Sequence, residues 1–245
     1  MAFARIVPEV VGRIEEHTPQ GIANILWAFA SAGHDDEALF GSVRAHLLDG
    51  ASRFPPADGA RGRLHEFNEQ ELSLTAWAYA TIAQPTSAEE LALFESLGRE
   101  ATRRAHTLSQ QATSNLAWAF ASRGYAAPKL FDVVATRLAE DAAEYSGIGL
   151  GITTWAVAAH DAASGGRHVR RALYARLADE CARRVSEFNQ QGLSQLSWSF
   201  ATFGVPAPQL YCAIEERALA IAPEFSAQGL HLLLFGFAKH GHIAE

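Results

Sequence analysis

The chain has 245 residues, of which 49% are hydrophobic and 19% charged, and its formal net charge is −7. This apolar fraction excludes a largely disordered chain, and the acidic balance disfavours a protein that coats nucleic acid through bulk positive charge. No charge-free hydrophobic run reaches the ~20 residues of a membrane-spanning helix, so we expect no membrane contact. The length suits one large domain or two small ones.

Aromatic residues recur at regular intervals along the chain. Five tryptophans lie 50, 41, 37 and 43 residues apart, and a phenylalanine follows the last by 37 (Trp27, Trp77, Trp118, Trp155, Trp198 and Phe235). These six residues are called the anchors of repeats one to six, and other positions are counted from them. The intervals reduce to a base period of 37 residues with insertions of 13, 4 and 6, the largest within residues 50–63. Such a period is typical of a solenoid built from helical repeats.

Each anchor is expected to lie on a helix whose start is marked by a capping residue. Nine residues before the anchors stand six residues that favour a helix N-cap: Thr18, Asn68, Ser109, Ser146, Asn189 and Ser226. Apolar residues flank most of these caps at the N′ and N4 positions. Glycine stands six residues after four of the anchors, where a helix ends in the left-handed region. We expect this first helix of each repeat to start within two residues of its cap.

A second helix is expected to follow in each repeat near a Leu-aromatic pair, and Pro128 and Pro208 stand where it would start. The first helices are almost uncharged, so we expect them to pack between neighbours, with Trp77, Trp118 and Trp198 largely buried. Residues 1–17 then form a second helix without its first, and Gly241 closes a first helix without its second. Such ends suit a fragment, or ends that dock on another molecule. The prediction is an all-α solenoid without a β-sheet, in a single array over residues 1–245.

Two segments carry a resemblance to a known family. They run from Leu108 to Phe131 (LSQQATSNLAWAFASRGYAAPKLF) and from Phe188 to Tyr211 (FNQQGLSQLSWSFATFGVPAPQLY). In each segment a glutamine stands seven residues before a Trp-x-Phe-Ala motif, and a glycine follows the motif. This pattern resembles the octotricopeptide and heptatricopeptide repeats, and the resemblance extends over essentially the whole chain. Those are α-solenoid repeats in organellar proteins of algae and apicomplexans. The resemblance implies organellar RNA binding, in RNA processing, translation or a mitochondrial ribosome.

Positions −7, +4 and −3 of each first helix fall at about 20°, 40° and 60° from the anchor and form one narrow stripe. Its side chains are mostly uncharged donors and acceptors, which suit the base edges of single-stranded RNA at one base per repeat. The candidate RNA-binding residues are Gln20, Asn24, Gln70, Gln111, Asn115, Ser122, Gln191, Gln195 and Gln228. The alternative is that the glutamine at −7 bonds a neighbouring helix terminus and only holds the stack. In the fourth repeat the stripe is apolar: Ile148, Ile152 and Ala159.

Phosphate groups need positive charge, and the densest arginine cluster lies beside the insertion of the fourth repeat. Guanidinium groups suit bidentate phosphate contacts, so the candidates are Arg167, Arg170, Arg171 and Arg176. The alternative is a solvated face of a second helix. No nucleophile motif, phosphate-binding loop or metal-binding spacing occurs, so we expect no enzyme, cofactor or metal site. Cys181 and Cys212 are expected to be small core residues.

Two classes of function remain open from the sequence. The first is an organellar RNA-binding helical-repeat protein, a structural or assembly component of a ribonucleoprotein such as the mitochondrial ribosome. Its partners would be single-stranded or ribosomal RNA and neighbouring proteins of a large complex, in the mitochondrion or alternatively the plastid. The second is a protein–protein interaction scaffold of an organellar complex without direct RNA contact. The polar stripe and the arginines favour RNA, whereas the net charge and the apolar fourth repeat favour protein.

Overall fold

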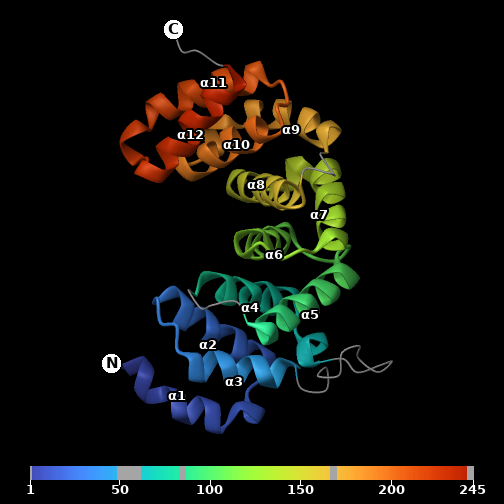
Figure 1. Cartoon of the computed structure of the whole chain (residues 1–245), viewed down its shortest axis with the longest axis vertical. Coiled ribbons are helices and arrows are strands. Elements are labelled where there is room, and N and C mark those ends of the chain that lie inside the picture. Colours follow the sequence, from blue (N-terminus) through green and yellow to red (C-terminus); the bar gives the residue numbers. More distant parts are fainter. Residues whose placement is uncertain (1, 49–61, 83–86, 166–169, 242–245) are drawn as a thin grey trace. The chain divides into compact units, whose positions relative to one another are not determined.

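A computed structural model describes residues 2–48, 62–82, 87–165 and 170–241, which form twelve α-helices and no strand (Figure 1). The helices are α1 Ala2–Gly12, α2 Pro19–Ser31, α3 Glu37–Leu48, α4 Glu69–Thr81, α5 Ala88–Arg104, α6 Gln110–Arg123, α7 Pro128–Asp141, α8 Gly147–Ala163, α9 Arg171–Arg183, α10 Gln190–Thr202, α11 Pro208–Ala220 and α12 Ala227–His240. The all-α prediction is confirmed. No described helix combines the length and hydropathy needed to cross a membrane. The insertion predicted within residues 50–63 falls almost entirely outside the described residues.

The first helices α2, α4, α6, α8, α10 and α12 begin where the capping pattern predicts. Each follows its predicted N-cap residue, whose side chain accepts a hydrogen bond from the backbone N–H three residues later. In α4 the cap is reciprocal, because the Glu71 side chain also accepts from the backbone N–H of Asn68. The glycines six residues after the anchors all have positive φ, as predicted: Gly33 (69°), Gly124 (68°), Gly204 (58°) and Gly241 (76°).

The second helices are α1, α3, α5, α7, α9 and α11. α7 begins at Pro128 and α11 at Pro208, as predicted. The sequence did not predict the short 3-10 turns that stand before five of the first helices. These turns are η1 Ile14–Glu16, η2 Arg63–Glu66, η3 Ala142–Glu144, η4 Val185–Glu187 and η5 Ala222–Glu224.

The chain divides into two compact halves, Met1–Leu130 and Phe131–Glu245. In the N-terminal half, α2, α4 and α6 pack side by side in one layer, and α1, α3 and α5 pack in a second layer (Figure 1). In the C-terminal half, α10 packs between α8 and α12, while α9 packs against α11. Within each half, first helices therefore contact first helices, and second helices contact second helices.

Aromatic side chains at position +2 join the two layers. In the N-terminal half, the buried ring of Tyr79 lies 5.2 Å from that of Phe40, and its hydroxyl donates to the Phe40 carbonyl oxygen at 2.7 Å. Phe120 makes the same edge contact with Phe94 at 5.2 Å. In the C-terminal half, Phe200 contacts Tyr174, and Phe237 contacts Tyr211. Position +2, at about 200° from the anchor, is thus the side of the first helix that faces the second-helix layer.

The anchors differ in burial. Trp77, Trp118 and Trp198 are neither fully buried nor exposed, which agrees in part with their predicted burial, whereas the first and last anchors, Trp27 at 47% and Phe235 at 42%, are exposed. The rings of Trp77 and Trp118 lie 6.4 Å apart and tilted by 30°. The anchors stand about 160° away from position +2 around the helix, and they therefore line the margin of the core.

The two cysteines differ in burial. Cys181 is fully buried, as predicted, and burial raises the pKa of its thiol to about 12. Cys212 was predicted to be a core residue and is instead exposed. It lies on α11 directly after Tyr211, whose buried ring faces the first helices. Successive residues of a helix point about 100° apart, so the side chain of Cys212 points away from the contact between the two layers.

Candidate nucleic-acid interface

The stripe of positions −7 and +4 lies on the side of the first helices that faces away from the second helices. Position +2 contacts the second-helix layer, and positions −7 and +4 lie about 160–180° from it around the helix axis. All five glutamines at −7 are exposed: Gln20, Gln70, Gln111, Gln191 and Gln228. They occupy the first turn of α2, α4, α6, α10 and α12, one residue after the start of each helix, so the N-cap fixes their position.

The side chains of these glutamines make no hydrogen bond to any other described residue. The alternative role, in which the glutamine bonds a neighbouring helix terminus, would require such a bond. An exposed amide offers one acceptor oxygen and two N–H donors, a set that matches the edges of unpaired bases. Within the described part of the chain, the −7 position is therefore polar, accessible and available.

Position −3 is less accessible than predicted. Asn24 is exposed and Asn115 half-buried, but Gln195 is 6% exposed, and its Oε1 has no hydrogen-bond partner among the described residues. At about 60° from the anchor, this position turns toward the neighbouring first helix. The prediction that Gln195 belongs to an accessible stripe is therefore wrong, because α10 packs between α8 and α12.

The hydroxyl side chains at position +4 offer acceptors rather than donors. Ser122 is exposed, and its hydroxyl donates to the Ala119 carbonyl oxygen at 3.2 Å. In the same way, Thr81 donates to Trp77 at 2.8 Å and Thr202 to Trp198 at 2.7 Å. Each hydroxyl hydrogen is therefore engaged within its own helix, which leaves the oxygen lone pairs for a ligand.

In the fourth repeat the stripe positions are apolar, and one of them is exposed. Ile148, at the start of α8, is 54% exposed, while Ile152 and Ala159 are half-buried. The other five first helices carry a glutamine at this position. An exposed isoleucine there offers apolar contact area and no hydrogen bond. This part of α8 suits an apolar contact and not a base edge.

The structure does not bring the arginine candidates together with the stripe. Arg171 and Arg176 are exposed on α9, a second helix, whereas the stripe faces away from the second-helix layer. Arg167 lies outside the described residues. A single strand that follows the stripe would therefore not meet Arg171 and Arg176 on the same face.

Arg170 is engaged within the protein. Its side chain is 17% exposed and forms ion pairs with Asp161 of α8 and, at 2.6 Å, with Asp132 of α7. Burial alone would lower the pKa of its guanidinium, but the hydrogen bonds to Asp161 and Asp132 raise it. These bonds connect the start of α9 to α7 and α8. Arg170 therefore links α9 to α7 and α8, and its guanidinium group is not free for the phosphate contact that we predicted.

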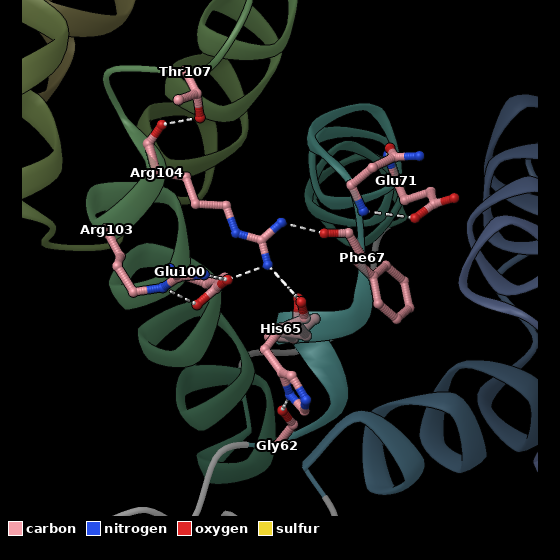
Figure 2. Close-up of polar contacts among 10 residues, drawn as sticks. Gly62, His65, Phe67, Glu71, Glu100, Arg103, Arg104 and Thr107 are labelled. Carbon is pink, nitrogen blue, oxygen red and sulfur yellow. Dashed lines mark hydrogen bonds and ion pairs between the residues drawn. The ribbon is translucent and has the colours of Figure 1, made fainter.

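A second group of arginines, which sequence reasoning missed, reaches back to the turn of the preceding repeat. Figure 2 shows Arg104, at position −14 of the third repeat, between α5 and the turn η2 of the second. Its guanidinium donates to the carbonyl oxygens of His65 at 2.7 Å, Leu64 at 3.5 Å and Phe67, and it pairs with Glu100. We call this arrangement the arginine clamp.

The clamp recurs in the C-terminal half with the same register. Arg184, at −14 of the fifth repeat, donates to the carbonyl oxygens of Tyr145 at 2.6 Å, Ala142 at 3.2 Å and Ala143 at 3.4 Å. In both clamps the acceptors are positions −13, −12 and −10 of the preceding repeat. The hydrogen bond with Glu187 raises the pKa of Arg184, and the same bond lowers the pKa of Glu187.

A sequence signal for the clamp exists. Arginine stands at −14 in four repeats, and glutamate stands at −11 in five, as in Arg13-x-x-Glu16 and Arg184-x-x-Glu187. The glutamate orients the guanidinium through an i, i+3 ion pair. Arg63, at −14 of the second repeat, also reaches the preceding turn η1, but it donates to the Glu15 carboxylate at 2.7 Å and not to a backbone carbonyl oxygen.

A pocket of about 600 Å³ lies between α5 and the segment that leads into α7. Phe94 and Phe120 contribute apolar surface to it, and Arg99 and Lys129 stand among its lining residues with exposed side chains. Nothing in the period of the anchors predicts this pocket, because it forms between residues of different helices. It adds positive charge on the second-helix side of the N-terminal half.

No protein-family model matches the chain, and no curated protein sequence matches it. The function is therefore inferred from the geometry of the repeats.

Proposed function

We propose that the chain is an RNA-binding helical-repeat protein of an organelle, in which single-stranded RNA lies along the first helices of an α-solenoid with a base period of 37 residues. The observation that carries the proposal is the row of exposed, unpaired glutamines at −7 on five helix starts. Within each half the glutamines are one repeat apart, so each bound nucleotide has its own side chain there. This is the arrangement by which helical repeats read RNA at one base per repeat.

Two neighbouring features support this proposal. The half-buried tryptophans stand about 20° from the glutamines around the helix, and their partly accessible rings offer faces on which bases can stack. The first turn of each first helix also carries the positive end of a helix dipole, which favours phosphate nearby. Among the described residues at −7, −3 and +4, Lys239 is the one positive charge. Affinity would then depend more on stacking and neutral hydrogen bonds than on salt-sensitive ion pairs.

The mitochondrial ribosome or a comparable ribonucleoprotein is the setting we propose. A solenoid with few cations on its binding face gains from neighbouring proteins that supply additional contacts to the RNA. The resemblance to organellar repeat proteins supports this setting, with the plastid as the alternative compartment.

The second candidate function is a protein-interaction scaffold. The observation that favours it is the exposed Ile148 on α8, together with half-buried Ile152, at positions that carry polar residues in most other repeats. Exposed apolar side chains are common at the centre of protein contacts. Under this hypothesis the glutamines bind a partner chain.

Filter binding with a pool of single-stranded RNA at several salt concentrations tests the two candidates. Gln191→Ala is expected to lower affinity by about 2- to 10-fold, the equivalent of one neutral hydrogen bond, and to change preference at one nucleotide. The matched control is Gln190→Ala, the same residue type one position earlier and off the stripe. Absence of binding by the folded wild-type protein at low salt would overturn the RNA proposal and leave the scaffold.

A further inference from the structure

Two repeats of the N-terminal half carry the same residues at all three stripe positions. Repeats one and three both have glutamine at −7, asparagine at −3 and serine at +4: Gln20, Asn24 and Ser31, and Gln111, Asn115 and Ser122. Repeat two keeps the glutamine but carries Leu74 at −3 and Thr81 at +4. Its first helix α4 packs against both α2 and α6. Two identical stripe sets therefore stand on either side of a different one.

The shared set does not follow from shared packing. At the buried positions −5 and −1, α2 carries Ile22 and Leu26, whereas α6 carries Thr113 and Ala117. The residues that pack against neighbouring helices thus differ between the two repeats, while the residues of the stripe are the same. Packing alone would not keep the stripe the same while the buried residues change, so the cause lies with what the stripe contacts.

The fold gives no reason for asparagine at −3. Asn24 is exposed and Asn115 is half-buried, and neither side chain forms a hydrogen bond with another described residue. Asparagine is also a poorer helix former than leucine, and both asparagines stand inside a helix. Leu74 shows that an aliphatic side chain fits the same position of α4. The two amides are therefore explained by a ligand and not by stability.

The amides at −7 and −3 can act together. They are four residues apart, so their Cβ atoms lie roughly 5–6 Å from each other on one face of the helix. Each amide offers one acceptor oxygen and two N–H donors, and the polar edge of an unpaired base offers both complements. In repeat two, Leu74 takes the place of one amide and Gln70 alone remains. Two amides discriminate between bases more strongly than one, because a wrong base loses more hydrogen bonds.

We propose that the N-terminal half selects an RNA triplet whose two outer nucleotides carry the same base, with a less restricted nucleotide between them. This inference rests on the proposed binding of RNA along the first helices. Since α2, α4 and α6 pack side by side (Figure 1), their three stripe sets meet three successive nucleotides at one base per repeat. The same side chains at the same helical positions select the same base.

The C-terminal half has a different composition at −3. Its residues there are Ile152, Gln195 and Leu232, of which two are aliphatic and Gln195 is 6% exposed. Among the described stripe residues of this half, each repeat therefore has at most one accessible amide. The strongest base selection belongs to the N-terminal half, and the C-terminal half adds weaker preferences.

Selection of a randomised pool of single-stranded RNA on the intact chain, followed by sequencing of the bound molecules, tests the triplet. The bound molecules are expected to carry the same base at two positions separated by one nucleotide, with a broader choice between them. Binding without such a pair, or without any base preference, would overturn this inference and leave the proposed RNA binding in place. Failure of every RNA to bind would overturn both.

A matched pair of variants assigns the outer nucleotides. Asn24→Leu and Asn115→Leu each give a repeat the residue that repeat two already has at −3, and the higher helix propensity of leucine favours folding, which circular dichroism checks. Each variant is expected to lose about 2- to 10-fold of its discrimination against a wrong base, the equivalent of one neutral hydrogen bond. The loss should fall on opposite ends of the triplet in the two variants. Loss at the same nucleotide in both, or at none, would contradict the assignment.

Leu74→Asn is the converse variant, because it gives repeat two the second amide. The middle nucleotide is expected to acquire a preference of about 2- to 10-fold for the base that the outer positions select. Asparagines with a purely structural role would change thermal stability without changing preference at a single nucleotide. A folded variant whose middle nucleotide stays unrestricted, or prefers a different base, would overturn the inference.

Discussion

The clamp arginines contribute to stability because their charged donors bond several backbone carbonyl oxygens of the preceding turn in a partly buried setting. Arg184 is 16% exposed and donates to three carbonyl oxygens of the turn before α8. A planar guanidinium with donors in a fixed fork can reach all three at once, which a single ammonium group cannot. Arg184 therefore joins two repeats through backbone atoms of the turn. This contact does not depend on which side chains the turn carries.

Arg184→Ala is expected to lower the free energy of unfolding by about 2–4 kcal/mol, since a hydrogen bond from a charged donor contributes roughly 1.5–3 kcal/mol. Arg184→Lys should recover less than half of this loss. Urea denaturation followed by circular dichroism measures both. The control is the neighbouring Arg183→Ala, whose exposed ion pair with Glu180 should contribute less than about 1 kcal/mol. Equal losses at positions 183 and 184 would contradict the role of the clamp.

Sequence patterns predicted the features that depend on a few adjacent residues. A cap is a contact between residues three apart, so Asn189 and Ser226 could be assigned from their types and spacing. The clamp joins residues about 40 positions apart, and its register is fixed only once helices have packed. The same holds for Gln195, whose burial depends on α8 and α12. The exposure of Trp27 was missed because a hydrophobic type was equated with a central place in the core.

At the scale of the helix, close packing depends on glycine where two first helices meet. In α12, Gly236 lies against Ser197, and in α8, Gly151 lies against Gly192, where a methyl group would come within 3.3 Å of the Gly192 Cα. A glycine inside a helix costs about 1 kcal/mol relative to alanine. Its presence in these helices is explained by the closeness of the neighbouring backbone.

Gly236→Ala is expected to destabilise the protein by about 1–3 kcal/mol, because the clash with the Ser197 backbone outweighs the gain in helix propensity. Gly21→Ala in α2 is the matched control. No atom lies closer than 3.5 Å to its added methyl group, so it should stabilise by up to about 1 kcal/mol. Thermal melts compare the two variants. Stabilisation by both substitutions would show that α10 and α12 do not approach as closely as described.

At the scale of the whole molecule, each half has its own helix layers and its own clamp. The N-terminal half contains Arg104 and the turn η2, and the C-terminal half contains Arg184 and the turn η3. Repeat proteins gain stability mainly from contacts between neighbours, so a local loss weakens the nearest helices first. The halves can therefore be examined separately within the intact chain.

Hydrogen exchange followed by mass spectrometry is expected to show this separation. Arg184→Ala should accelerate exchange at least about tenfold in α8 and α10, because a loss of 1.4 kcal/mol already gives a factor of ten, while α2 and α4 keep their protection. Arg104→Ala should do the reverse: exchange becomes faster in α4 and α5 and stays unchanged in α10. The two variants thus serve as controls for each other. Equal acceleration in both halves by either substitution would mean that the chain unfolds as one cooperative body, and the local account of the clamps would be wrong.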